Sequence, residues 1–136
     1  MRRRRARADG AGTVAHTQLE QLVAHAVHRE FAGEATHGAS SSAEHARVVL
    51  AGAAGRLAAM VAGWLRVGFC QGNFNADNCL VGGRTMDYGP FGWMDVYDPM
   101  FAKWVGSGQH FAFLNQPNAA LANYQVREGN AVFGNS

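Results

Sequence analysis

Apolar residues recur at helical spacing in two stretches of the first half of the chain. Thr17 and Glu20 have the spacing of a capping box, and the following apolar positions are Leu19, Leu22, Val23, Ala26, Val27 and Phe31. This pattern predicts a helix over about residues 18–32. His25 and His28 lie three residues apart on that helix. With no third ligand nearby, we expect them to face solvent rather than to bind a metal.

The second stretch predicts a longer helix. A connector rich in Gly, Ala and Ser, residues 33–42, overlaps a second capping box formed by Ser41 and Glu44. From there to about Arg66 a broad apolar face continues through Val48, Val49, Ala53, Leu57, Met60, Val61, Trp64 and Leu65. Three glycines within it would let a neighbouring element come close. We therefore expect a helix buried in a larger body.

The pattern changes after the second helix. A polar loop over residues 71–78 is followed by the apolar run 79–81, by Gly82-Gly83, and by residues 84–86. Gly-Gly supplies the positive φ angles of a two-residue hairpin turn, so we predict strand, turn and strand over residues 79–86. The expected fold class is mainly α with a short β-hairpin.

The last third of the chain combines an aromatic stretch with a third helix. We expect the large apolar residues of 91–113 to pack as a core below the polar loop, with Asp95 and Asp98 as turn formers. An aromatic surface for base stacking is disfavoured because Lys103 is the only Lys or Arg among them. Residues 115–117 predict a helix start, and 127–136 a frayed C-terminus.

Composition adds limits to this picture. The chain has 136 residues, 48% of them hydrophobic, which is enough for one modest core. The net charge of +2 depends on five arginines within residues 1–16, which we expect to be a disordered tail. A nucleic-acid binder is an alternative that depends on this tail alone, and we expect no nucleic-acid partner. No apolar run approaches the roughly 20 residues of a membrane span and no secretory signal is present, so we predict an intracellular protein without a membrane partner. Cytoplasm and mitochondrion both remain open.

The two cysteines, Cys70 and Cys79, have no second pair for a zinc site or a disulfide framework. We expect both to be reduced and packed inside. The polar loop offers different chemistry. Asp77 and Asn78 would lie at one end of the predicted hairpin, with Asp87 returning beside them, and a hard cation such as Mg²⁺ prefers such oxygen ligands. The alternative is that these residues only form turns.

The order of these elements matches the catalytic half of the protein-kinase signature, H-R-D-x-x-x-x-N followed by D-F-G. Gln71, Asn73 and Asn78 occupy the positions of its His, Asp and Asn, and Tyr88 that of its Phe. More specific matches are Gly68-Phe69-Cys70, Gly72, Asn75, Asp77-Asn78, Asp87-Tyr88-Gly89-Pro90-Phe91-Gly92, Asp95, Tyr97-Asp98-Pro99 and Asn115-Gln116-Pro117. On these motifs, residues 19–124 resemble the selenoprotein O family, protein adenylyltransferases with a kinase-like fold.

The resemblance implies a partial protein-kinase-like C-lobe over residues 17–126. It implies that Asp77 is the catalytic base, that Asn78 and Asp87 bind Mg²⁺ (or Mn²⁺), and that Asp87 also faces the phosphates of ATP. The family is thought to hold ATP inverted relative to kinases and to transfer AMP to Ser, Thr or Tyr hydroxyls of proteins. ATP and such protein substrates are therefore the expected partners.

The chain also departs from the family pattern. Gln71 stands where most members have His, and Asn73-Phe74 replaces the usual small or apolar pair. Nothing before Leu19 resembles the glycine-rich loop or strand lysine of the N-terminal lobe, so we expect a fragment of a larger enzyme that is inactive alone. The alternative is a non-catalytic relic or interaction module that retains the C-lobe core.

Overall fold

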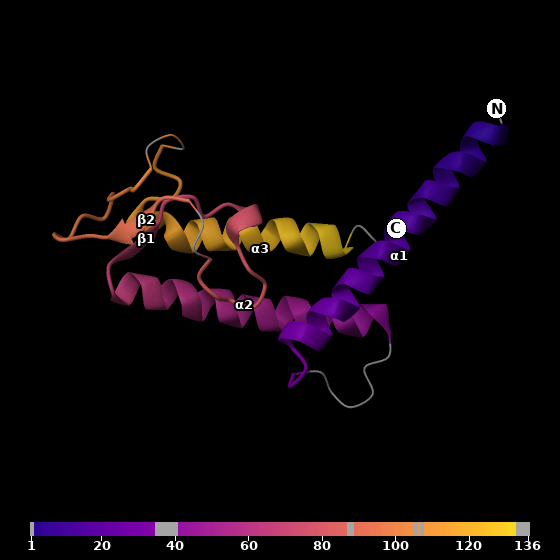
Figure 1. The fold of residues 1–136 in the computed structure, drawn as a ribbon, viewed down its shortest axis with the longest axis horizontal. Coiled ribbons are helices and arrows are strands. Elements are labelled where there is room, and N and C mark those ends of the chain that lie inside the picture. Colours follow the sequence, from indigo (N-terminus) through magenta and orange to yellow (C-terminus); the bar gives the residue numbers. More distant parts are fainter. Residues whose placement is uncertain (1, 35–40, 87–88, 105, 107, 133–136) are drawn as a thin grey trace.

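The computed structural model describes the backbone of residues 2–34, 41–86, 89–104, 106 and 108–132, and the side chains of those within 13–126. In these ranges the elements are α1 (Arg2–Glu30), α2 (Ser42–Arg66), β1 (Phe69–Gln71), the 3₁₀ turn η1 (Ala76–Asn78), β2 (Phe91–Trp93), the 3₁₀ turn η2 (Phe113–Asn115) and α3 (Gln116–Val132). Helices α2 and α3 lie side by side and run in opposite directions, with the two strands at one end of the pair (Figure 1). The described chain is thus mainly α with one two-stranded sheet.

Helix α1 starts earlier than the sequence predicts. It runs from Arg2 and so passes through the residues expected to form a disordered tail. Thr17 does not cap it, because its Oγ1 donates to the main-chain carbonyl of Thr13 at 3.0 Å. Arginine and alanine favour helices, which explains why the helix can extend through this stretch. At the other end, Val27 and Phe31 are buried where α1 packs on α2.

Helix α2 confirms the predicted capping box. The Ser41 side chain accepts a hydrogen bond from the Glu44 main-chain nitrogen at 3.3 Å, and the Glu44 carboxylate accepts one from the Ser41 main-chain nitrogen at 3.1 Å. The helix ends at Arg66, as expected, and its buried side chains are Ala53, Leu57, Val61 and Trp64. The spacing of three or four residues keeps one face of α2 on the core.

The predicted hairpin over residues 79–86 is wrong. That segment contains no strand, and the antiparallel partner of β1 is β2, which pairs Phe69 with Trp93 and Gln71 with Phe91. Glycine at position 83 does have a positive φ of 65°, in a turn where its nitrogen donates to the carbonyl of Leu80 at 3.0 Å. The predicted turn at Gly82-Gly83 is therefore present, but no strands flank it.

Residues 82–85 bind to the helices instead of to each other. A side chain at Gly83 would collide with the main chain of Arg56 on α2, so the segment lies directly on that helix. Arg84 forms an ion pair with Glu30 of α1 at 2.8 Å, and the Trp64 indole donates to the Thr85 hydroxyl at 2.8 Å. These contacts place the residues that follow the turn on α1 and α2 rather than in a β-ladder.

The core lies between α2, β1, the loop after β1, and α3. Its buried members are Leu57, Val61, Trp64, Phe69, Phe74, Cys79, Ala119 and Ala120. Trp64 and Phe74 form an edge-to-face pair with ring centroids 4.9 Å apart, the arrangement that aromatic rings prefer. Cys70 and Cys79 are both buried, which confirms the prediction that they pack inside.

The expectation of an aromatic core over residues 91–113 is mostly wrong. Phe113 is buried, whereas Phe91, Trp93, Tyr97 and Trp104 are 38–69% exposed. The reason is that β2 pairs with one strand only, and its alternation turns Phe91 and Trp93 to the same exposed face. Asp98 is a turn former as predicted, since its carboxylate accepts from the Met100 nitrogen at 2.9 Å.

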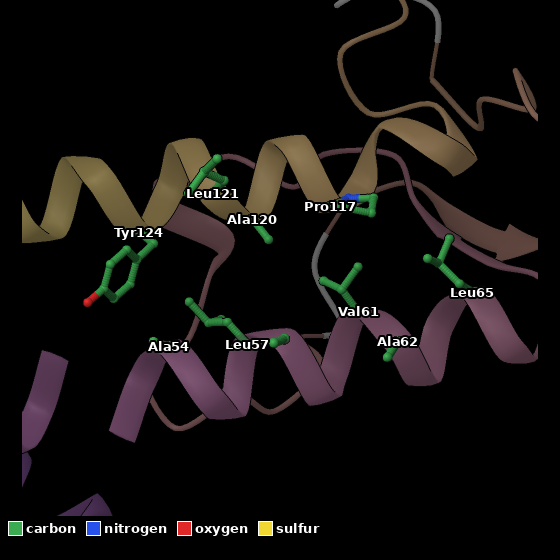
Figure 2. A pocket seen from close by; sticks show the side chains of 10 residues that line it. Ala54, Leu57, Val61, Ala62, Leu65, Pro117, Ala120, Leu121 and Tyr124 are labelled. Carbon is green, nitrogen blue, oxygen red and sulfur yellow. The ribbon is translucent and has the colours of Figure 1, made fainter. Parts of the chain in front are cut away.

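A groove of about 490 Å³ runs between the packed helices α2 and α3 (Figure 2). Apolar side chains line it, with Leu57 and Val61 on α2 and Ala120 and Tyr124 on α3 among them.

By length and composition alone α2 could cross a membrane, so the prediction that no apolar run is long enough is wrong. Core helices of soluble proteins meet the same criterion, and α2 packs on α1, β1 and α3.

Candidate functional site

The polar loop that follows β1 is organised by its own asparagines. Asn75 is the N-cap of η1, and its side-chain oxygen accepts a hydrogen bond from the main-chain nitrogen of Asn78 at 3.1 Å. The Asn75 amide nitrogen lies 3.3 Å from the side-chain oxygen of Asn73. Short amide side chains close such turns because they can replace main-chain partners. The 3₁₀ turn therefore holds Asp77 and Asn78 at fixed places in the loop.

Asp77 and Asn78 are neighbours with different surroundings. Asp77 is exposed in the middle of η1, whereas Asn78 is only 7% exposed. The Asn78 amide nitrogen donates to the main-chain carbonyl of Asn73 at 2.9 Å. This bond fixes which end of the amide is used inside the loop and leaves the side-chain oxygen as the atom that can bind a hard cation.

Asp87 and Tyr88 lie outside the described residues, but the residues on both sides of them adjoin the loop. The carbonyl of Met86 accepts a hydrogen bond from the side-chain nitrogen of Gln71 at 2.8 Å. Gly89 has φ of 85°, and a Cβ there would lie 3.1 Å from the Cβ of Asn73. The structure thus brings Met86 and Gly89, the residues that flank Asp87 and Tyr88, next to the loop, while the position of Asp87 itself stays a prediction.

Two residues that the sequence analysis did not connect with the site support the loop from α3. Gln116 is fully buried: its side-chain oxygen accepts from the main-chain nitrogen of Gln71, and its amide nitrogen donates to the carbonyl of Phe69, both at 2.9 Å. Asn123 donates to the carbonyl of Phe74 at 2.9 Å. The sequence did carry a signal for them, because Gln116 and Asn123 lie seven residues apart on the same helix face as the apolar Ala119 and Ala120. Amides on a buried face need hydrogen-bond partners, which the neighbouring loop provides.

Other titratable groups do not add to the site in the part of the chain that the structure describes. His25 and His28 are exposed, as predicted, and no three His, Cys, Asp or Glu residues come together there as a metal site. Cys70 lies in β1, but its thiol donates to the carbonyl of Phe111 at 3.3 Å, and burial raises its pKa. A thiol of raised pKa stays protonated and is a poor nucleophile.

The comparisons with known proteins agree with the motifs. The family model described as "Protein adenylyltransferase SelO" matches residues 13–129, and the chain therefore belongs to this family. "Protein nucleotidyltransferase YdiU" of Azoarcus sp. (strain BH72) is 36% identical over 118 residues, which are 85% of this chain and 22% of that protein. The protein of the same name in Rhodopseudomonas palustris (strain TIE-1) is 45% identical over 76 residues, or 55% of this chain and 15% of that protein.

The matched segment is thus about a fifth or less of the length of these relatives. The match includes α2, the polar loop and α3 as far as residue 129. Both of these relatives are named as nucleotidyltransferases.

Proposed function

We propose that this chain supplies the loop that positions the nucleophile and the metal in a protein adenylyltransferase, which transfers AMP from ATP to Ser, Thr or Tyr hydroxyls of proteins. The observation that carries the proposal is the pair at η1. Asp77 is exposed directly before Asn78, whose amide nitrogen is tied to the carbonyl of Asn73. Family membership supports nucleotide chemistry at that loop.

Asn78 and Asp87 would hold Mg²⁺ (or Mn²⁺). The donor set fits because the side-chain oxygen of Asn78 remains for a cation once its nitrogen is bonded, and Asp87 would add a carboxylate. The ion, when bound, would offset the charge of the phosphates of ATP. Asp87 would in addition face those phosphates, as the family resemblance implies.

Asp77 would orient the hydroxyl of the protein substrate and accept its proton. The hydroxyl oxygen then forms a bond to the α-phosphorus, the bond from that phosphorus to the oxygen bridging to the β-phosphate breaks, and pyrophosphate leaves. Asn73 occupies the position where kinases have their catalytic Asp, and a carboxamide cannot serve as that base. The exposed carboxylate of Asp77 has no such restriction.

The test is parallel labelling with ATP that carries its label on the α- or the γ-phosphate. A suitable protein is the Azoarcus sp. relative in which the 118 matched residues are replaced by those of this chain. We expect label from the α-position on protein, its loss in Asp77→Ala and Asp87→Ala, and its retention in Gln125→Ala, a change of an exposed residue on α3.

Label from the γ-position alone would contradict adenylyl transfer and indicate a kinase. Absence of label from either position, in a folded protein that still binds ATP, would favour the alternative of a non-catalytic relic or interaction module. Retained α-label in Asp77→Ala would remove the role proposed for that carboxylate.

A further inference from the structure

The side chain of Gln71 is nearly fully buried and only half satisfied. It is 1% exposed at the end of β1, and its nitrogen donates to the carbonyl of Met86 at 2.8 Å. Its side-chain oxygen is buried without a hydrogen-bond partner, and it is the one such side-chain atom found among the described residues. Gln71 is thus an exception to the rule that buried polar atoms are paired.

A half-satisfied amide in a core costs stability that an apolar side chain would not. Methionine has a similar length and no polar oxygen to desolvate, so packing alone would favour it over glutamine at this position. The gain from glutamine is its one side-chain bond, which is made to Met86. The hydrogen bond to Met86 is therefore the feature that distinguishes Gln71 from an apolar residue at this position.

The bond joins two segments that are 15 residues apart in sequence. On one side, Gln116 fixes the main chain of β1 by bonding to both Gln71 and Phe69. On the other side, Met86 directly precedes Asp87 in the sequence. Gly72, the next residue after Gln71, donates to the carbonyl of Pro90 at 2.8 Å. Two consecutive residues of the loop thus hold the chain on both sides of residues 87–89.

We propose that Gln71 is a positioning residue, whose amide nitrogen sets the place at which the chain enters the D-Y-G motif relative to the loop of Asp77 and Asn78. That Gln71 positions this segment depends only on its hydrogen bond to the Met86 carbonyl. Its consequence, that metal binding depends on Gln71, rests on the proposed function.

The test separates the donor from the bulk of the side chain. In the 136-residue chain, Gln71→Met lacks a donor, whereas Gln71→His retains a ring nitrogen that can donate. Hydrogen exchange is measured over residues 83–94, with Gln125→Met as the matched exposed control. We expect the Met variant to exchange about tenfold faster in this segment, and the His variant to stay close to the wild type.

Thermal unfolding of the same variants shows whether bulk stability changes. Gln71→Met should unfold close to the wild-type temperature although its segment opens faster, because the variant also removes the unpaired oxygen. Unchanged exchange in Gln71→Met, relative to the control, would overturn the proposal. Equal acceleration in Gln71→His would overturn it too, since the donor would then not matter.

Binding of Mn²⁺, followed by its electron paramagnetic resonance, separates this inference from the proposed function. Weaker binding in Gln71→Met than in wild type supports both. If wild type binds no Mn²⁺ while the exchange results hold, the positioning role stands and the proposed metal site fails. If Mn²⁺ binds equally to all variants, metal binding does not depend on Gln71.

Discussion

Asn123 on α3 donates from its side-chain nitrogen to the main-chain carbonyl of Phe74, at 2.9 Å and across 49 residues of sequence. Both residues are buried, Phe74 completely. The bond therefore connects the last helix with the centre of the loop that carries Asp77 and Asn78. A change on α3 should reach that loop through it.

Asn123→Leu should destabilise the chain by about 1–3 kcal/mol, because the Phe74 carbonyl would be left buried without its partner. Urea unfolding measures the change in the free energy of unfolding. The control is Asn118→Leu, which alters an exposed position on the same helix. An equal loss in both variants would mean that leucine on α3 is the cause, not the bond.

Loss of the capping box should weaken α2. Ser41→Ala removes the side chain that accepts from the Glu44 nitrogen, so we expect a loss of about 1 kcal/mol in thermal or urea unfolding. Ser41→Asp keeps an acceptor at the N-cap and should unfold like the wild type. Equal stability of Ser41→Ala and wild type would show that α2 does not depend on its cap.

The ion pair between Glu30 and Arg84 should make stability depend on acid. The hydrogen bond from Arg84 lowers the pKa of Glu30 below its ordinary 4.5. A lowered folded-state pKa stabilises the folded chain above the ordinary value, and this contribution is lost as pH falls below it. Arg84→Met should therefore lose stability at neutral pH and show a flatter decline below about pH 4.5. Arg47→Met, at an exposed position of α2, is the control, and an equally steep decline in Arg84→Met would contradict the prediction.

The groove between α2 and α3 should cause self-association of the isolated chain, since its apolar walls are open to solvent. Leu121→Lys places a charge on its edge, where Leu121 is 56% exposed. Sedimentation should detect less association in this variant than in Leu114→Lys, which changes a leucine of η2 that is 46% exposed. The same reduction in both would point to net charge rather than to the groove.

The isolated chain should bind ATP with Mg²⁺ weakly. The loop over residues 71–78 can supply oxygen ligands, but it contains no basic side chain to hold phosphates. Calorimetry on the 136-residue chain should therefore find no tight complex. An affinity in the sub-micromolar range would contradict this and would indicate that the described half of the site is sufficient.

The sequence predicted the parts of the fold that depend on local signals. Ser41 and Glu44 mark the start of α2 because both members of a capping box lie within one turn. The start of α3 was likewise predicted from neighbouring residues, 115–117. The family was recognised from motifs and is confirmed by the match over residues 13–129.

What the sequence could not predict depends on contacts between distant residues. Neither β1 nor β2 was predicted, because Gly82-Gly83 suggested a local hairpin over residues 79–86 instead. In the structure, Trp64 and Glu30 bind that segment to the helices. Of the asparagines of the loop, Asn78 alone was assigned a role, as a metal ligand, and no structural role was predicted for Asn75. In the structure Asn75 closes the 3₁₀ turn, and Asn78 divides its amide between an internal bond and a free oxygen.

The support of the polar loop has a consequence for how the site would respond to changing charge. Gln71, Gln116 and Asn123 hold it through amides, which carry no charge and do not titrate. Between residues 71 and 78, Asp77 is the only ionisable side chain. The hydrogen bonds that support the loop should therefore depend little on ionic strength or on pH. Binding of a cation or release of an anion would then change the electrostatic potential at Asp77 without weakening these hydrogen bonds.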